Sequence, residues 1–144
     1  MFIEEKLYIE ILNSIPLLCV DLIITDSKNR YLLVKRNNAP LKDEFWVPGG
    51  RVLLKENVRD SAVRLMSSEL GLSCSIDKIN LYGLYQDLFT QNAFQNNVNY
   101  HTVSVVFKVM GFNEDSPIFL DLQSSDLIWS EVLPDRLIHK MILF

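Results

Sequence analysis

The sequence contains little cysteine and histidine, and it has no long hydrophobic run. Cys19 and Cys74 are its only cysteines, and His101 and His139 are its only histidines. So few cysteines do not make a disulfide framework, and we expect buried thiols in a cytoplasmic protein. No apolar stretch approaches the roughly 20 residues that cross a bilayer. The acidic, amphipathic start, MFIEEKLYIEIL, lacks the basic residues and apolar run of a secretion signal.

An excess of basic residues is also absent. The chain carries 14 Lys and Arg against 18 Asp and Glu, a net charge of -4. Nothing in this charge favours a nucleic-acid backbone as the main partner. An anionic small ligand would need local cations or a divalent metal. With 144 residues, of which 49% are hydrophobic, the chain suits one domain with a sizeable core.

The hydrophobic pattern predicts strands with a central helix and a helix at each end. Apolar residues recur at Val58, Ala62, Met66 and Leu70, which indicates one face of an amphipathic helix over 57–70, and Gly71 is placed to end it. The other expected elements are helices at 4–13 and 134–141 and strands at 17–25, 31–34, 45–47, 79–88, 100–110 and 127–129. This order predicts an α+β fold with a mixed sheet.

Residues 47–72, VPGGRVLLKENVRDSAVRLMSSELGL, contain glycines and charged residues at a specific spacing. Gly50, Glu56, Arg64 and Glu69 occupy positions that resemble the Nudix box, a loop–helix–loop that binds a divalent metal and a nucleoside diphosphate. Glycine lets the backbone approach a ligand closely, and carboxylate-held Mg²⁺ can neutralise a diphosphate.

The resemblance implies one Nudix domain over residues 1–144, with the box at about 50–72. Its fold would be a mixed β-sheet sandwiched between helices (α/β/α), and its cofactor would be Mg²⁺.

The box departs from the common pattern at positions that should be carboxylates. Leu65, Ser68 and Glu69 share one helix face, because they are three or four residues apart or adjacent. In typical Nudix pyrophosphatases this face supplies a cluster of metal ligands. Leu65 can neither bind a cation nor accept a proton, and Ser68 is a poor ligand for a hard metal. Attack on phosphorus with several metal ions is therefore hard to build here.

One branch of the family has the same reduction. The sequence is similar to GDP-mannose mannosyl hydrolases in the stretches MFIEE, LLVKRNNAP, FWVPGGRV, RLMSSELGL and LYGLYQ, and again at 123–129. Those enzymes attack the anomeric carbon of the sugar and release GDP and mannose, with one Mg²⁺ on the diphosphate. The resemblance implies the same reaction, with GDP-mannose as the default nucleotide sugar.

This resemblance also implies a metal site and a diphosphate site. Mg²⁺ would be held by the Gly49 carbonyl, Glu69 and Gln123, an all-oxygen set that suits this ion. Arg36 and Arg51 would stabilise the departing GDP, because a guanidinium group can bind two phosphate oxygens at once.

Further residues are expected to contact the substrate. Asp21 corresponds to a substrate contact of the family, and it interrupts an apolar strand where an unpaired carboxylate would be costly. Asp87 and His101 correspond to family positions on the sugar side. We expect Arg64 to be mainly an ion-pair partner that orients the box. Glu56 would either support the metal ligands without binding the ion or act as a charge at the helix N-terminus.

The general base is the point at which the resemblance ends. The family places a histidine directly after the metal-binding glutamine, whereas this chain has Ser124. Asp121, Asp126 or Asp87 could replace it as the catalytic carboxylate. A general base contributes about 10²–10⁴ in rate, so its loss would slow an enzyme without abolishing activity.

Three functions stay open from the sequence. The first is hydrolysis of a GDP-sugar at carbon, and the second is a Nudix pyrophosphohydrolase that cleaves P–O–P. The third, favoured by Ser124, is a nucleotide-sugar binding module with impaired catalysis. A small-molecule nucleotide sugar is the expected partner, without nucleic acid or membrane. The resemblance further implies a homodimer and a role in polysaccharide biosynthesis.

Overall fold

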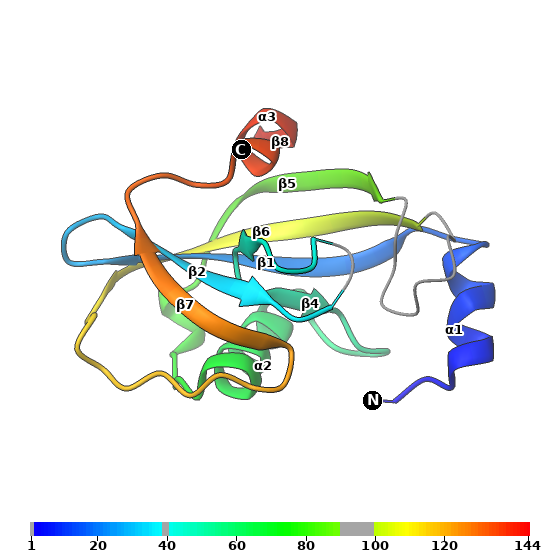
Figure 1. Ribbon diagram of the computed structural model, residues 1–144, viewed down its shortest axis with the longest axis horizontal. Helices are drawn as coiled ribbons and strands as arrows, with labels where there is room; N and C mark the ends of the chain where they lie inside the picture. The colour runs from blue at the N-terminus through cyan, green and yellow to red at the C-terminus, as the bar shows by residue number, and fades with distance from the viewer. Residues whose placement is uncertain (1, 39–40, 90–99) are drawn as a thin grey trace.

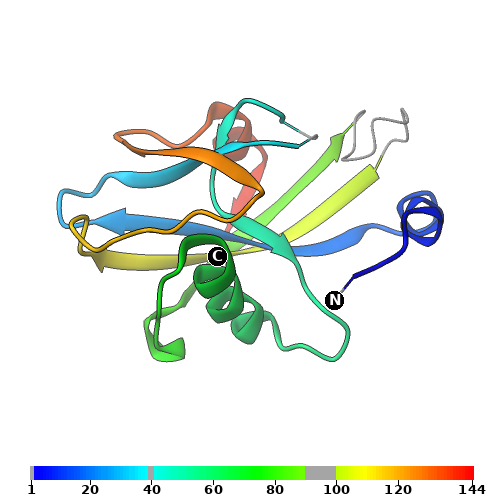
Figure 2. The same ribbon diagram turned by 60° about the horizontal axis from the view of Figure 1, so that its bottom comes forward.

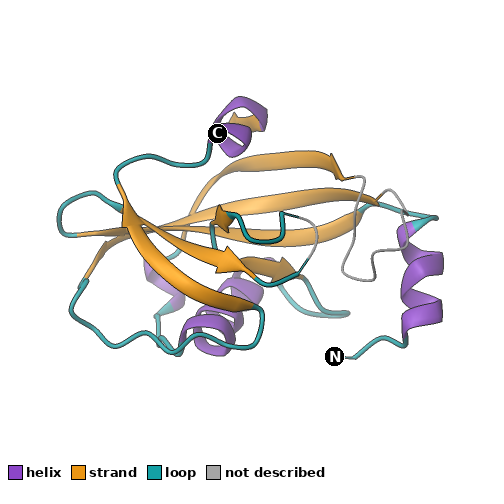
Figure 3. Cartoon of the chain, viewed as in Figure 1, coloured by secondary structure: helices purple, strands orange, loops and turns teal. Residues whose placement is uncertain are grey.

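An eight-stranded mixed sheet forms the centre of the computed structural model, which describes residues 2–38, 41–89 and 100–144 (Figures 1 and 3). The strands are β1 (Leu17–Asp26), β2 (Tyr31–Arg36), β3 (Phe45–Trp46), β4 (Gly49–Arg51), β5 (Asn80–Phe89), β6 (Tyr100–Phe112), β7 (Ser124–Ser130) and β8 (Met141–Leu143). The helices are α1 (Glu5–Leu12), α2 (Val58–Leu70) and α3 (Asp135–Lys140), with a short 3₁₀ helix at Ile76–Lys78.

The strand order is β3-β2-β1-β6-β5-β8, with β4 paired to β1 and β7 paired to β2. β1 and β6 run parallel, and the other pairs are antiparallel. In Figure 2, β2 and β7 diverge from the plane of β1, β6 and β5. This arrangement confirms the predicted α+β fold and makes β1 the strand that joins both parts of the sheet.

Helices α2 and α3 lie on opposite faces of the sheet (Figures 1 and 2). Alternate residues of β1 reach the two faces. Val20 and Leu22 belong to the core cluster that contains the apolar side of α2, whereas Ile23 belongs to the cluster that contains Leu137 of α3. The two clusters enclose the sheet between helices, as predicted.

Helix α2 begins and ends close to the predicted positions. Its N-cap is Asn57, whose side chain accepts a hydrogen bond from the Arg59 N–H at 2.9 Å. Its C-cap is Gly71, which adopts a left-handed conformation with φ 66°. Of the helices in the described residues, none is both long and apolar enough to cross a membrane.

Two short strands differ from the sequence-based prediction. The expected helix at 134–141 ends at Lys140, because Met141 already pairs with Tyr85 of β5 and starts β8. The Gly49–Gly50 segment, which is not among the expected strands, is the start of β4 and pairs with β1. In both places pairing with a distant strand determines the local structure.

Candidate active site

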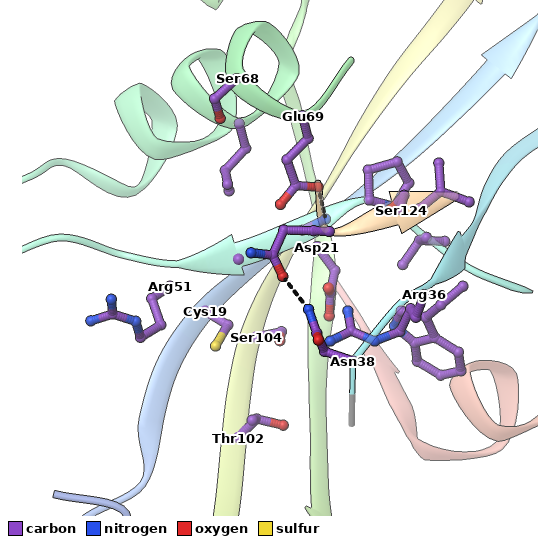
Figure 4. Close-up of a pocket in the computed structure, with 18 of the residues that line it drawn as sticks. Cys19, Asp21, Arg36, Asn38, Arg51, Ser68, Glu69, Thr102, Ser104 and Ser124 are labelled. Atoms are coloured by element: carbon purple, nitrogen blue, oxygen red, sulfur yellow. Dashed lines mark hydrogen bonds between the residues drawn. The ribbon is translucent and has the colours of Figure 1, made fainter. Parts of the chain in front are cut away.

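A cavity of about 590 Å³ opens beside β1 and β4 near the end of α2 (Figure 4). Strand β1 forms part of its wall and the last turn of α2 reaches it from one side. Asp121, Gln123 and Ser124 reach it from another. The structure brings most of the predicted site residues to this cavity: Asp21, Arg36, Gly49, Arg51, Glu69, Asp121 and Gln123.

Three predicted site residues, all within the described part of the chain, do not line the cavity: Asp87, His101 and Asp126. Asp126 lies on β7 opposite Lys35, is exposed, and accepts a hydrogen bond from the Leu127 N–H at 2.8 Å. His101 pairs with Leu88 between β5 and β6. Their strand positions place these three residues outside the lining of the cavity, and their roles in substrate binding and catalysis stay predictions.

Asp87 is engaged in a buried network on β5. Its fully buried side chain accepts hydrogen bonds from the Tyr85 hydroxyl at 2.5 Å and the Lys140 ammonium at 2.6 Å, and it is also paired with Arg136. Burial alone would raise the pKa of Asp87, but these hydrogen bonds outweigh it and bring the pKa to about 2. Asp87 therefore anchors α3 to the sheet.

Gly49 is required by the close approach of β4 to β1. A Cβ atom at this position would lie 2.4 Å from Asp21 Oδ1 and 2.5 Å from the Val20 carbonyl oxygen. At Gly50 a Cβ atom would lie 2.8 Å from Cδ2 of Leu65. The glycine pair thus brings backbone atoms close to the carboxylate of Asp21 on one side and to α2 on the other.

Glu69 is the carboxylate that α2 presents to the cavity. It accepts a hydrogen bond from the Gly49 N–H at 3.3 Å. Burial raises the pKa of Glu69 to about 8, and the nearby negative charge of Asp121 adds to the rise. A carboxyl group that is difficult to ionise in the absence of a cation is a suitable ligand for one.

The segment with Asp121 and Gln123 is fixed to the end of α2. The Asp121 N–H donates to the Glu69 carbonyl at 3.2 Å, and the Phe119 N–H donates to the Leu70 carbonyl at 2.8 Å. The Gln123 N–H donates to Asp121 Oδ1 at 2.9 Å. These contacts explain why residues far apart in sequence meet at one site.

The donor atoms at this end of the cavity fit a hard cation such as Mg²⁺. Glu69 and the side-chain oxygen of Gln123 are both oxygen donors, and Asp121 lies beside them. The rest of the α2 face adds no carboxylate, because Leu65 is a buried core residue and Ser68 carries an exposed hydroxyl. Among residues 2–38, 41–89 and 100–144, no group of three or more His, Cys, Asp and Glu side chains could hold a metal ion. A cation at this end of the cavity would therefore also need neutral oxygen donors such as the side-chain amide of Gln123.

Asp21 lies in the wall of the cavity and is 8% exposed. Burial raises the pKa of Asp21 to about 6, against the lowering effects of a hydrogen bond with Ser104 and of the positive charge of Arg36. Cys19, two residues earlier on the same face, has its pKa raised to about 12 by burial and by the charge of Asp21. Asp21 is therefore a partnered, buried carboxyl group that faces the ligand space.

Arg64 forms a structural ion pair, as the sequence suggested, and its partner is Glu56. Arg64 Nε lies 2.6 Å from Glu56 Oε1, and Arg64 also donates to the Arg51 carbonyl at 2.9 Å. The hydrogen bond from Arg64 is the main reason that the pKa of Glu56 falls to about 2. The pair ties the start of α2 to β4 and so orients the glycine segment.

Several cavity residues had no signal in the sequence. Tyr85, Trp46 and Asn38 line the space, with the Tyr85 and Trp46 rings 5.7 Å apart. Tyr8 of α1 also lines it and lies under the guanidinium of Arg51, 5.3 Å from its ring centroid. Each comes from a different element, so only the folded chain reveals their proximity.

Residues 16–127 match the family model for the NUDIX domain. The chain belongs to the Nudix family. This Nudix chain is 29% identical over 117 residues to the low-salt glycan biosynthesis protein Agl8 of Haloferax volcanii. The aligned residues cover 81% of this chain and 72% of that protein. It is 37% identical over 93 residues to the ADP-ribose pyrophosphatase of Methanocaldococcus jannaschii, which covers 64% of this chain and 49% of that one. The chain thus spans about half the length of that pyrophosphatase.

Solved structures share the Nudix fold. The MutT protein of Methanosarcina mazei has a TM-score of 0.65 at 20% identity, with 84% of this chain and 87% of that chain covered. A MutT/nudix family protein of Enterococcus faecalis has a TM-score of 0.63 at 22% identity, with 81% and 44% covered. These similarities confirm the predicted Nudix fold, and family membership supports hydrolase activity.

Proposed function

We propose that this Nudix protein hydrolyses a GDP-sugar, with GDP-mannose as the first candidate, to GDP and free hexose. The main support is the α2 face, where Glu69 is accompanied by a buried Leu65 and an exposed Ser68. Cleavage at phosphorus with several metal ions needs more ligands than this face offers. Attack on the anomeric carbon needs only a neutralised leaving group.

A divalent cation, Mg²⁺ by preference, would bind to Glu69, Gln123 and the Gly49 carbonyl, with Asp121 beside them. When bound, it would neutralise the diphosphate and make GDP a better leaving group. A bifunctional enzyme of Francisella tularensis, similar to this chain with a TM-score of 0.62 at 20% identity, was solved with AMP and a Mn ion, in line with the use of a divalent metal in this family.

The residues of the chain have distinct tasks in this reaction. Arg36 and Arg51 line the cavity and would bind the diphosphate, while Asp21 would bind a sugar hydroxyl. The oxygen of a water molecule attacks the anomeric carbon, and the bond from that carbon to the diphosphate oxygen breaks. The electron pair of that bond leaves with GDP, and the proton of the water passes to a carboxylate or to solvent.

We assign Asp121 as the carboxylate that accepts the proton of the attacking water. Of the three predicted replacements for the missing histidine, it lines the cavity, whereas Asp87 and Asp126 lie outside it. Asp121→Asn should lower kcat by about 10²–10⁴, the usual contribution of a general base. Asp126→Asn is the matched control and should leave kcat unchanged. Equal effects of the two substitutions would contradict the assignment.

Two other functions have support of their own. The ADP-ribose pyrophosphatase similarity, at 37% identity, favours cleavage of P–O–P in a nucleotide sugar. Ser124, in the place of the expected histidine, favours a binding module with little turnover. The similarity to a glycan biosynthesis protein supports a role in polysaccharide biosynthesis, to which we add a cytoplasmic location and a homodimer as part of the same proposal.

The deciding experiment uses GDP-mannose and Mg²⁺ in ¹⁸O-labelled water, with products followed by mass spectrometry and ³¹P NMR. GDP and labelled mannose would support attack at carbon. GMP and mannose 1-phosphate would show attack at phosphorus and refute our interpretation of Leu65 and Ser68. Tight binding of GDP-mannose without product would favour the binding module, and parallel reactions with ADP-ribose test the pyrophosphatase alternative.

A further inference from the structure

Two asparagines after β2 connect this strand to the segment that carries Gln123. The Asn37 N–H donates to the Gln123 carbonyl at 2.9 Å, and the Asn37 side-chain amide donates to the Leu122 carbonyl at 2.9 Å. The Asn38 side-chain amide donates to the side-chain oxygen Oε1 of Gln123 at 3.0 Å (Figure 4). Asn37 therefore fixes the backbone of this segment, and Asn38 contacts the side chain.

The backbone of Gln123 is fixed without any help from Asn38. Its N–H donates to Asp121 Oδ1, and its carbonyl accepts from Asn37. These contacts leave the side-chain torsions of Gln123 undetermined, because they involve main-chain atoms of that residue only. Within the described part of the chain, the hydrogen bond from Asn38 is the contact that sets the direction of the side-chain oxygen.

We propose that Asn38 is a positioning residue that orients the oxygen of Gln123 for the cation; the inference rests on the metal site of the proposed function. A carbonyl oxygen has two lone pairs, so Oε1 can accept from Asn38 and still bind a metal. A donor on the ligating oxygen also keeps the amide nitrogen of Gln123 turned away from the cation. Such partners of metal ligands typically contribute about 10–100-fold to metal affinity.

The test measures Mn²⁺ affinity by electron paramagnetic resonance of the free ion, without substrate and without turnover. Asn38→Leu keeps the approximate size of the side chain but cannot donate, and it should weaken Mn²⁺ binding by about 10–100-fold. Asn80→Leu, at an exposed asparagine of β5 outside the cavity, is the matched control and should keep the wild-type affinity. Thermal unfolding of each variant shows that the chain remains folded.

A second background separates positioning from a general structural effect. Gln123→Ala should itself weaken Mn²⁺ binding, and adding Asn38→Leu to it should cause no further loss, because Asn38 acts through Gln123. An equal loss in both backgrounds would overturn the inference, since Asn38 would then act independently. So would an unchanged or tighter affinity of Asn38→Leu in the otherwise wild-type chain.

The outcomes also distinguish this inference from the proposed function. A wild-type protein that does not bind Mn²⁺ would overturn the metal site and the inference together. A wild-type protein that binds Mn²⁺ while Asn38→Leu binds it equally well would overturn the inference alone.

Discussion

The ion pairs of Asp87 predict that Asp87→Asn changes the free energy of unfolding in opposite directions, depending on whether Arg136 and Lys140 are present. The side chain of Asp87 is completely buried, whereas those of Arg136 and Lys140 are 40% and 45% exposed. Removing the cations therefore leaves a buried charge without compensation, while removing the carboxylate leaves cations that water already reaches. The two perturbations are not equivalent, and their combination should show it.

Arg136→Met with Lys140→Met should lower the free energy of unfolding by about 3 kcal/mol, the lower end of the range for breaking a buried ion pair. At about 2–4 °C per kcal/mol for a domain of this size, Tm should fall by roughly 6–12 °C. In the wild-type chain, Asp87→Asn should also destabilise, by about 1–2 kcal/mol, because charge-assisted hydrogen bonds are lost. In the double-variant background the same Asp87→Asn should stabilise, because it removes the uncompensated charge.

Urea unfolding followed by tryptophan fluorescence measures all four proteins. Trp46 is a suitable reporter, because its ring lies 5.7 Å from that of Tyr85, whose hydroxyl binds Asp87. Lys6→Met, at an exposed lysine of α1, is the control and should change stability by less than about 0.5 kcal/mol. Destabilisation by Asp87→Asn in both backgrounds would refute the reasoning.

Three further predictions concern the glycine pair, the α2 face and the box ion pair. Gly49→Ala should reduce both stability and GDP affinity more than Gly50→Ala. A Cβ atom added at position 49 would lie 2.4 Å from a carboxylate oxygen of Asp21, whereas one added at position 50 would lie 2.8 Å from a movable methyl group of Leu65. Thermal unfolding and calorimetry test this prediction, and equal losses in the two variants would contradict it. Ser68→Glu, at an exposed position on the cavity, should tighten Mn²⁺ binding and add GMP and hexose 1-phosphate to the products. The free energy of unfolding should change by less than about 0.5 kcal/mol. An unchanged Mn²⁺ affinity would show that this face of α2 does not reach the cation. Glu56→Gln should lower the free energy of unfolding by about 1–3 kcal/mol at neutral pH. Since the pKa of Glu56 lies at about 2 in the folded protein against an ordinary 4.5, the contribution of its carboxylate is complete above the ordinary pKa and is lost as the pH falls through the folded value. The stability difference from wild type in urea should shrink across that window, and a pH-independent difference would argue against the Arg64 pair as its source.

Local sequence signals were sufficient for the box helix. The four-residue spacing of its apolar positions and the terminal glycine predicted α2 closely, because the signals that start, bury and end a helix lie within the helix or next to it. The strand at residues 141–143 was not predictable in this way. Their apolar run continues the pattern of α3, and pairing with β5 is what makes them a strand.

In the candidate site, too, residues within a local motif could be predicted and residues with distant partners could not. Gly49 and Glu69 sit inside a motif whose spacing is visible in the sequence, and both line the cavity. Asp87 was predicted to bind substrate because it corresponds to a family position on the sugar side, whereas its partners Arg136 and Lys140 lie 49 and 53 residues away along the chain. No local pattern reveals a buried ion pair of that separation. Asn38 was missed for the same reason, since its contact with Gln123 spans 85 residues.

The two departures from the common box are physically different, and this difference bears on the reaction. Leu65 packs under Gly50 in the core cluster and is 4% exposed. A carboxylate in its place would be buried close to Glu69, whose pKa burial already raises to about 8, so the surrounding packing opposes a charge there. Ser68 is exposed on the cavity and would accept a carboxylate at little cost. In this chain the packing around position 65 therefore opposes a carboxylate, whereas the exposure of position 68 does not. For this reason Ser68→Glu tests whether a second carboxylate is enough to redirect attack toward phosphorus, whereas loss of folding in Leu65→Glu would say nothing about the reaction.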